Sequence, residues 1–449
     1  MSHYQVSPDQ VIPTLQKNIL VDGFHVIIDL EKSKGSYIHD AVSGKDLLDF
    51  YSYFASLPVG HNHPKLTNDP EFIKALTRAA IANPANSDIY CPEYAAFVEQ
   101  FAKHAMPAEL KYLFFVAGGA LAIENALKTA FDWKVRKNRA AGKGEKGSKI
   151  LHFRECFHGR SGYTMSLTNT DPVKTDLFPK FSDWPRITNP KIQFPLDDKE
   201  NKRVAEVEAR AVAEIEDAFA RYPDDIAAII IEPIQGEGGD NHFRKEFFVE
   251  LRRLADKHDA LLIFDEVQTG GGLTGKLWAY QHFGVTPDIL AFGKKFQVCG
   301  IAVGPRIDEV KDNVFKVSSR INSTWGGNLV DMVRCIKYLE IIREEKLVEN
   351  AAAMGEKMLG GLRDMAKKFD CISNVRGRGL FVAFTLKDTA QRNAIRQACW
   401  DAGLASLSSG STSIRFRPCL TVTAAEIDKA MGILEQALEK TIGKKRAAG

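Results

Sequence analysis

The chain has 449 residues, of which 45% are hydrophobic and 26% are charged, and its formal net charge is only +3. That length suggests two or more lobes, and the composition is ordinary for a globular protein. The balanced charge gives no reason to expect a nucleic-acid partner, and no apolar run is long enough to span a membrane.

The first 70 residues or so have the pattern of short strands separated by turns, with strands predicted at 26–29, 36–40 and 47–53. From about residue 75 to 325 the pattern alternates between helix and strand, which predicts a doubly wound α/β domain. Its predicted helices are 121–133, 204–221 and 245–258, and its predicted strands are 112–116, 149–153, 226–231, 261–264 and 289–292. The basic segment 134–149 is rich in Gly, Ala and Lys, and we expect a solvated loop there.

The last third of the chain mixes a long helix, predicted to include 332–345, with strands at 380–384 and 413–416. This part is therefore predicted to form a smaller α+β lobe, and we expect the N-terminal segment to pack with it. The predicted division is residues 1–72 as an N-terminal part of the small domain, 73–328 as the large domain, and 329–449 as the C-terminal part of the small domain. The basic end of the chain, Lys444 to Arg446, is expected to be a frayed tail.

Two of the predicted buried strands end on residues that can act together. Strand 261–264 runs into Asp265, and strand 289–292 is followed by Gly293, Lys294 and Lys295. Ligands of parallel sheets bind at the carboxyl ends of the strands, so these side chains are expected to lie close together. A carboxylate can pair with the protonated ring nitrogen of pyridoxal phosphate, and a lysine can hold its aldehyde as a Schiff base. The residues alone leave the choice between the two lysines open.

The acidic pair after strand 261–264 also fits two other interpretations. Asp265 and Glu266 could simply cap a helix after a buried strand. Four apolar residues before an acidic pair also occur in P-loop ATPases, and residues 270–276 fit G-x-x-x-x-G-K. Leu277 stands where a magnesium-binding Ser or Thr is needed, and the loop does not follow a strand of its own, so an ATPase is rejected.

Further candidates lie at other predicted strand ends. Gly118, Gly119 and Ala120 come between a strand and a helix, where backbone N–H groups can bind phosphate. Phe157 could stack on a flat ring, and Arg160 could bind a carboxylate. The remaining candidates are Glu237 in a glycine-rich turn and Arg415, which with Arg417 alternates with apolar neighbours; His61 and His63 are interpreted as a turn, not as metal ligands.

The seven cysteines are odd in number and show no C-x-x-C spacing, which argues against a disulfide framework or a zinc site. The first ten residues lack the apolar core of a signal peptide. We expect a cytoplasmic protein.

Taken in order, these motifs resemble the class III (ornithine/GABA type) aminotransferases of the fold-type I pyridoxal-phosphate enzymes. The resemblance extends from residues 60–64 (GHNHP) to 415–418 (RFRP) and is strongest to the members that act on the terminal amine of lysine, through the segments 124–128, 157–162, 182–185, 235–239, 292–295 and 322–328. It implies an α/β fold with a large doubly wound, mostly parallel sheet and a smaller α+β domain built from both chain ends. It also implies a homodimer with shared active sites and ping-pong transfer of the lysine ε-amino group to 2-oxoglutarate through pyridoxamine phosphate.

The resemblance assigns roles to individual residues. Lys294 would be the Schiff-base lysine and Asp265 the partner of the ring nitrogen. Arg160 would bind the α-carboxylate of lysine, and Arg415 that of 2-oxoglutarate, with Glu237 covering Arg415 while lysine is bound. The other cofactor-binding residues implied are Gly119, Ala120, Phe157, His158, Val267, Gln268 and Thr324 of the second subunit, and Gln268 and Asn322 join the substrate-binding set.

This chain departs from the family's pattern at Ala117, Ala120 and Phe296. Ala120 lacks a side-chain phosphate contact, and Ala117 and Phe296 are expected to place apolar groups near the cofactor, which would shift the substrate scope in a natural or an engineered variant. Alternatives kept open are a GABA-type or broad ω-transaminase, a class III mutase, racemase or decarboxylase, and a non-catalytic protein on the same fold.

Overall fold

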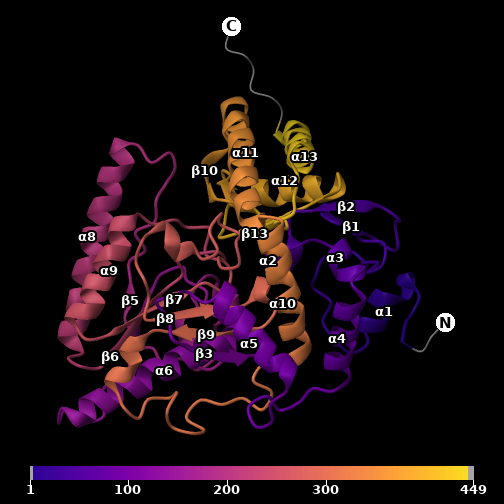
Figure 1. The fold of residues 1–449 in the computed structure, drawn as a ribbon. Helices are drawn as coiled ribbons and strands as arrows, with labels where there is room; N and C mark the ends of the chain where they lie inside the picture. Colours follow the sequence, from indigo (N-terminus) through magenta and orange to yellow (C-terminus); the bar gives the residue numbers. More distant parts are fainter. Residues whose placement is uncertain (1–3, 443–449) are drawn as a thin grey trace.

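A seven-stranded sheet forms the centre of the larger lobe in the computed structural model, which describes residues 4–442 (Figure 1). Its strand order is β3-β9-β8-β7-β6-β4-β5. β9 is antiparallel to both of its neighbours, and every other neighbouring pair is parallel. The strands are β3 (Tyr112–Val116), β4 (Lys149–Phe153), β5 (Arg186–Ile187), β6 (Ile226–Ile231), β7 (Leu261–Asp265), β8 (Ile289–Phe292) and β9 (Cys299–Val303).

Helices cover both faces of this sheet, which explains why its central strands are apolar throughout. α6 (Gly119–Ala140) packs on one face, where Ile263 of β7 lies. α5 (Pro92–His104), α8 (Asp198–Arg221), α9 (Lys245–Lys257) and α10 (Leu329–Glu344) contribute to the core on the other face, where Leu262 and Phe264 lie. Short helical segments connect these elements: α7 (Thr164–Leu167), η2 (Pro172–Lys174), η3 (Ala279–His282), η4 (Lys294–Phe296) and η5 (Pro305–Glu309).

The smaller lobe is assembled from both ends of the chain. The N-terminal strand β2 (Asp46–Asp49) pairs antiparallel with β1 (Tyr37–His39) and parallel with β12 (Leu404–Ala405). A second sheet is antiparallel throughout, in the order β10-β11-β14-β13. Its strands are β10 (Ser373–Arg378), β11 (Phe381–Thr385), β13 (Leu407–Ser409) and β14 (Ser413–Phe416), and the C-terminal helices are α11 (Leu347–Lys368), α12 (Thr389–Asp401) and α13 (Ala424–Ile442).

The N-terminal part also contains η1 (Pro8–Gln10), α1 (Val11–Leu15), α2 (Ser52–Ala55), α3 (Pro64–Thr67) and α4 (Pro70–Ile81). The predicted α/β fold, with a mostly parallel sheet and a smaller α+β lobe built from both ends, is confirmed. The domain bounds 1–72, 73–328 and 329–449 stay a prediction. The basic tail at Lys444 to Arg446 lies outside the described residues.

Several local predictions were wrong. The strand expected at 26–29 is only an isolated bridge between Ile28 and Asp40, and the strand expected at 47–53 ends at Asp49. The loop expected at 134–149 is helical as far as Ala140, because α6 continues through it. Lys134 is buried, and its Nζ donates a hydrogen bond of 2.6 Å to the backbone oxygen of Asp259. Tertiary contacts thus decide the structure of this basic segment, and its composition alone led to a wrong prediction.

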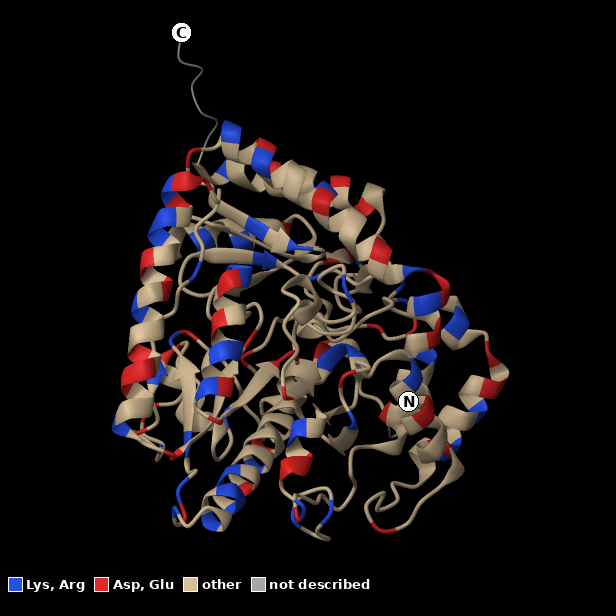
Figure 2. Ribbon diagram, turned by 60° about the vertical axis from the view of Figure 1, so that its left-hand side comes forward, with Lys and Arg blue, Asp and Glu red and all other residues tan. Residues whose placement is uncertain are grey.

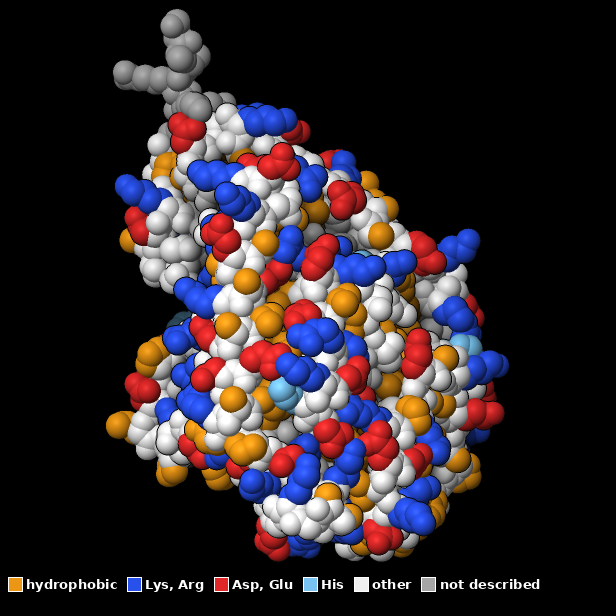
Figure 3. Space-filling view, turned by 90° about the vertical axis from the view of Figure 1, so that its left-hand side faces the viewer, with side chains coloured by type: hydrophobic (Ala, Val, Ile, Leu, Met, Phe, Trp, Pro, Cys, Tyr) orange, Lys and Arg blue, Asp and Glu red, His pale blue; other side chains and the backbone are white. Residues whose placement is uncertain are grey.

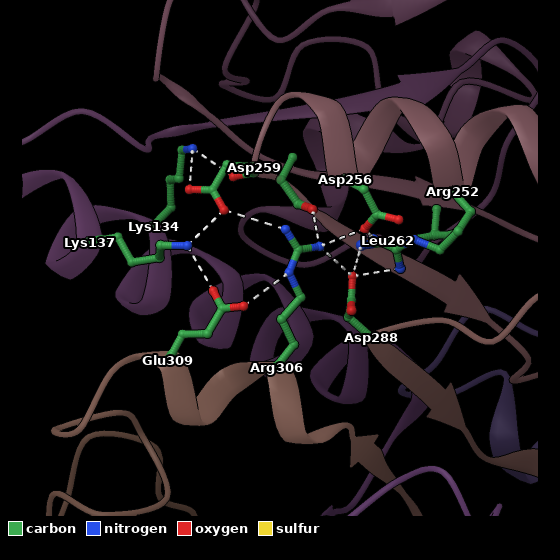
Figure 4. A network of polar contacts seen from close by, with 10 residues as sticks. Lys134, Lys137, Arg252, Asp256, Asp259, Leu262, Asp288, Arg306 and Glu309 are labelled. Carbon is green, nitrogen blue, oxygen red and sulfur yellow. Dashed lines mark hydrogen bonds and ion pairs between the residues drawn. The ribbon is translucent and has the colours of Figure 1, made fainter.

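A polar network fixes the ends of β7 and β8 that lie opposite their carboxyl termini (Figure 4). Oδ2 of Asp288 accepts hydrogen bonds from the backbone N–H of Leu262 at 2.7 Å and from Nη1 of Arg252 at 2.9 Å. Nη1 of Arg306 donates to the backbone oxygen of Ala260 at 2.9 Å. The network holds the register of the two strands, and that register delivers Asp265 and Lys294 to the same edge.

Charge lies on the helices and loops, while the strands of the large sheet carry almost none (Figure 2). On the face seen in Figure 3, acidic and basic side chains are intermixed, with no extended patch of one sign. Within residues 4–442, no helix is long and apolar enough to cross a membrane.

Candidate active site

A cavity of about 340 Å³ opens at the carboxyl ends of β7 and β8. It brings together ten of the predicted site residues: Gly119, Ala120, Phe157, His158, Arg160, Glu237, Asp265, Val267, Gln268 and Lys294. Gly159, Glu232 and Cys299 also line it and were not predicted as site residues. Arg415 lies behind Glu237, whereas Asn322 and Thr324 lie elsewhere.

Asp265 is the last residue of β7, and its carboxylate is held at both oxygens. Oδ1 accepts a hydrogen bond of 3.0 Å from the backbone N–H of Val267, and Oδ2 lies 2.8 Å from Nδ1 of His158. Burial disfavours the charged imidazole of His158, but the interactions with Cys156 and Asp265 prevail and raise its pKa well above the ordinary value. A cationic His158 is therefore a charged hydrogen-bond partner of the Asp265 carboxyl group at the cavity wall.

The two lysines after β8 occupy different environments. Lys294 lines the cavity, and among the described residues its Nζ makes no hydrogen bond or ion pair. Burial, together with the nearby charges of Arg415 and Arg417, lowers the pKa of Lys294 to about 8. Lys295 is 2% exposed and does not line the cavity; its Nζ donates a hydrogen bond of 3.0 Å to the backbone oxygen of Gln268. The Lys294 amine is therefore available in the cavity, whereas the Lys295 amine is hydrogen-bonded to the backbone.

The N-terminus of α6 offers backbone donors to the same cavity. Gly118, with φ of +118°, caps the helix without a side-chain hydrogen bond, so the first N–H groups of the helix are free for an anion. A Cβ atom added at Gly119 would lie 3.0 Å from Cγ1 of Val267. The close approach of α6 to the loop after β7 therefore needs a glycine at this position.

Glu237 and Arg415 form an ion pair at the small-lobe side of the cavity. Nη2 of Arg415 lies 3.0 Å from Oε2 of Glu237, and Arg415 is only 2% exposed. Arg415 keeps its Nε and Nη1 atoms buried without a hydrogen-bond partner in the described structure. Arg160, in contrast, is exposed and has no ion pair among the described residues. The guanidinium group of Arg160 is therefore open to a ligand, whereas that of Arg415 is already paired with Glu237.

Glu232 lines the cavity, but the sequence analysis did not predict it as a site residue. Its carboxylate accepts hydrogen bonds from the backbone N–H of Phe157 at 2.9 Å and of Gly236 at 3.0 Å. Burial is the largest cause that raises its pKa, to about 7, and Asp265 adds to it. An acidic residue directly after a fully buried strand was the signal that could have identified it.

Asn322 and Thr324 are exposed and lie away from the cavity of Lys294. Asn322 lines a second cavity of about 310 Å³ together with Asn86 and Tyr90. Ser87 donates a hydrogen bond of 3.2 Å to the backbone oxygen of Thr324. A single chain does not bring these two residues to the predicted site.

The three departures from the family pattern lie in different places. Ala120 lines the cavity, and its Cβ atom would be 2.6 Å from a Cβ atom added at Gly159. Ala117 is exposed at the end of β3 and does not line the cavity. Phe296 is buried in the core, with its ring 5.0 Å from Trp278 and 5.4 Å from Phe101. Phe296 does not line the cavity, because its ring packs in this aromatic cluster, and its effect on the cofactor stays a prediction.

The groups that line the cavity are those that pyridoxal phosphate needs. It combines an amine with a lowered pKa, a carboxylate held in place by its neighbours and free backbone N–H groups at a helix N-terminus. Phe157 and Val267 supply apolar surfaces between them. Among the described residues no group of His, Cys, Asp and Glu is arranged to hold a metal ion.

Comparisons with known proteins agree with this chemistry. Residues 20–438 match the family described as "Aminotransferase class-III". The chain is 51% identical over 434 residues to an L-lysine-epsilon aminotransferase of Mycobacterium tuberculosis, with 96% of each chain covered. It is 35% identical over 440 residues to the mitochondrial 4-aminobutyrate aminotransferase of Homo sapiens, with 90% of this chain and 84% of that protein covered. A solved structure of lysine aminotransferase from M. tuberculosis, in the internal aldimine form, has a TM-score of 0.95 and 50% identity, covering 97% of this chain and all of the other.

Proposed function

Because the chain belongs to the class III aminotransferases, we propose that it transfers the ε-amino group of L-lysine to 2-oxoglutarate, with pyridoxal 5′-phosphate as its cofactor. The products are 2-aminoadipate 6-semialdehyde and L-glutamate. One observation carries the choice of substrates: Arg415 is covered by Glu237, while Arg160 has no ion pair in the described structure. A donor with one carboxylate and a distant amine can use Arg160 alone, whereas a dicarboxylate requires both arginines.

When bound, pyridoxal phosphate supplies an electrophilic carbon and a ring that accepts electrons. Gly119 and Ala120 would donate backbone N–H groups to its phosphate, and Phe157 and Val267 would flank its ring. Asp265, backed by His158, would keep a proton on the ring nitrogen. Gln268 would donate to the ring hydroxyl. Each of these residues lines the cavity, which supports the proposed roles.

Lys294 would hold the cofactor and then move a proton. An amine must be unprotonated to accept a proton, and a pKa of about 8 gives Lys294 a usable neutral fraction near neutral pH. Lys295 lacks access to the cavity and is assigned no step. Arg160 would bind the substrate carboxylate so that the terminal amine points toward Lys294.

The active unit is proposed to be a homodimer. Thr324 and Asn322, which lie away from their own chain's cavity, would then serve the site of the second subunit. Large apolar side chains near them are exposed in the single chain, including Trp325 at 50% and Tyr90 at 75%. Exposure of this kind is typical of a surface that another protein covers.

The seven cysteines are free, which supports the proposal of a cytoplasmic location.

The nearest alternative is a transaminase of 4-aminobutyrate or of a broad range of ω-amines. To separate them, the holoenzyme would be incubated with 2-oxoglutarate and lysine, ornithine or 4-aminobutyrate, and glutamate would be measured in a coupled assay. Glutamate formed fastest from lysine supports the proposal. Glutamate from 4-aminobutyrate but not from lysine contradicts it. A mutase, racemase or decarboxylase would consume the amino acid without 2-oxoglutarate.

A further inference from the structure

The carboxylate of Glu237 lies between two cations, one on each oxygen. Oε2 faces Nη2 of Arg415 at 3.0 Å, and Oε1 faces Nζ of Lys174 at 2.5 Å. Lys174 belongs to η2, 63 residues before Glu237 and far in sequence from Arg415 in β14. No motif in the sequence marked Lys174 as a site residue.

Lys174 is placed at the cavity rim by its own loop. Oδ1 of Asp171 accepts a hydrogen bond from the backbone N–H of Val173 at 3.2 Å, and the N–H of Thr175 donates to the backbone oxygen of Pro172 at 2.9 Å. The Lys174 ammonium also lies 5.8 Å from the ring centroid of Phe157, which lines the cavity. The side chain therefore lies beside two residues of the cavity wall, Glu237 and Phe157.

The two cations are not equivalent partners for Glu237. The side chain of Arg415 is 2% exposed, whereas that of Lys174 is 23% exposed and reaches water. Burial favours a neutral Glu237, yet Arg415 and Lys174 together lower its pKa, so the carboxylate stays ionised. Because the cations bind different oxygens, Glu237 can leave Arg415 without leaving Lys174.

We propose that Lys174 determines the dual substrate specificity by holding Glu237 whenever a dicarboxylate takes its place on Arg415. This inference rests on the proposed function. With Lys174 present, the displaced carboxylate keeps a countercharge at its other oxygen. Without Lys174, an unpaired Glu237 would face the incoming carboxylate, and like charges at close range disfavour binding. The donor lysine leaves the Glu237–Arg415 pair in place and does not depend on Lys174.

The experiment uses the dimeric holoenzyme and the variants Lys174→Met and Lys174→Arg. Lys174→Met should raise KM for 2-oxoglutarate by about fivefold to tenfold, the size expected for loss of one partly buried ion pair, and leave KM for lysine within about twofold. Lys174→Arg should restore most of the loss. Lys180→Met is the matched control, since Lys180 lies in the same loop and its Nζ bonds the backbone oxygen of Thr175. It should match the wild type.

Binding of unreactive acids gives a second readout that does not need turnover. Calorimetry with glutarate should show weaker binding to Lys174→Met by the same factor, while hexanoate, with one carboxylate, should bind as to the wild type. In a Glu237→Gln background, Lys174→Met should no longer change the affinity for glutarate. An unchanged glutarate affinity in the single variant, or an equal loss for hexanoate or in the Glu237→Gln background, overturns the inference.

The two proposals fail in different ways. If the wild type forms no glutamate from lysine, the proposed function is wrong, and the glutarate titrations still decide the role of Lys174. If the wild type uses lysine but Lys174→Met leaves KM for both substrates unchanged, only the inference about Lys174 is wrong.

Discussion

Nδ1 of His158 lies 2.8 Å from Oδ2 of Asp265, and both side chains are buried at the cavity wall. The backbone N–H of Val267 holds the other carboxylate oxygen. A carboxyl group in so buried a place depends on these partners, because a buried polar group without a hydrogen bond is costly. The two contacts fix the orientation of the Asp265 carboxyl group at the cavity wall.

Asp265→Asn should lower kcat/KM for transamination by about a hundredfold or more, because a neutral amide cannot hold a proton on the ring nitrogen. His158→Gln should lower it less, since Asp265 keeps the Val267 hydrogen bond. Steady-state kinetics with lysine and 2-oxoglutarate measures both. More than a tenth of wild-type activity in Asp265→Asn would rule out the assigned role.

Lys294→Ala should abolish covalent attachment of the cofactor, whereas Lys295→Met should preserve it, because only Lys294 lines the cavity. Borohydride reduction followed by mass spectrometry of the peptide that contains both lysines measures the attachment. A label retained in Lys294→Ala and lost in Lys295→Met would reverse the assignment.

The pKa of Lys294 makes its contribution to stability depend on pH. In the folded, cofactor-free chain this pKa is about 8, below its ordinary value of 10.5, so the unfolded chain binds more protons between these values. The cost of burying Lys294 is therefore complete below about pH 8 and disappears as the pH rises toward 10.5.

Lys294→Met should consequently stabilise the cofactor-free chain by about 3 kcal/mol at pH 7, and the gain should shrink toward zero as the pH approaches the unfolded pKa. Urea unfolding of both chains across that range gives the difference in the free energy of unfolding. A difference that stays constant with pH would show that the pKa of Lys294 is not lowered.

Two neighbouring glycines should respond differently to alanine. A Cβ atom at Gly236 would lie 2.2 Å from Oε1 of Gln268, the flexible end of a side chain, so Gly236→Ala should displace Gln268. We expect cofactor affinity to fall about tenfold, the effect of losing one hydrogen bond to a charged group, with a nearly unchanged melting temperature. Spectroscopic titration with pyridoxal phosphate measures the affinity.

At Gly238 the added Cβ atom would lie 1.8 Å from the backbone oxygen of Glu155, which cannot move aside as a side-chain end does. Gly238→Ala should therefore destabilise the fold by about 2–3 kcal/mol, as strain in packed structure does. Thermal unfolding distinguishes it from Gly236→Ala. Equal melting temperatures for the two variants would contradict the assigned contacts.

Residues at regular strand ends were predictable. Asp265 and Lys294 follow apolar strands, and parallel pairing must bring such ends to one edge. Lys174 was not predictable, because an irregular loop sets its position and no periodic pattern reports where a loop folds. Lys134 was misjudged for a related reason: its basic neighbours suggested solvent, but α6 extends over it and buries it.

The pairing of β2 with β12 has a consequence for synthesis of the chain. β2 emerges from the ribosome early, but its parallel neighbour β12 arrives only near the end, about 20–70 s later at ~5–20 residues per second. The large sheet, complete at β9, can fold in that interval. The nascent chain should thus acquire the pocket for its cofactor before it acquires Arg415.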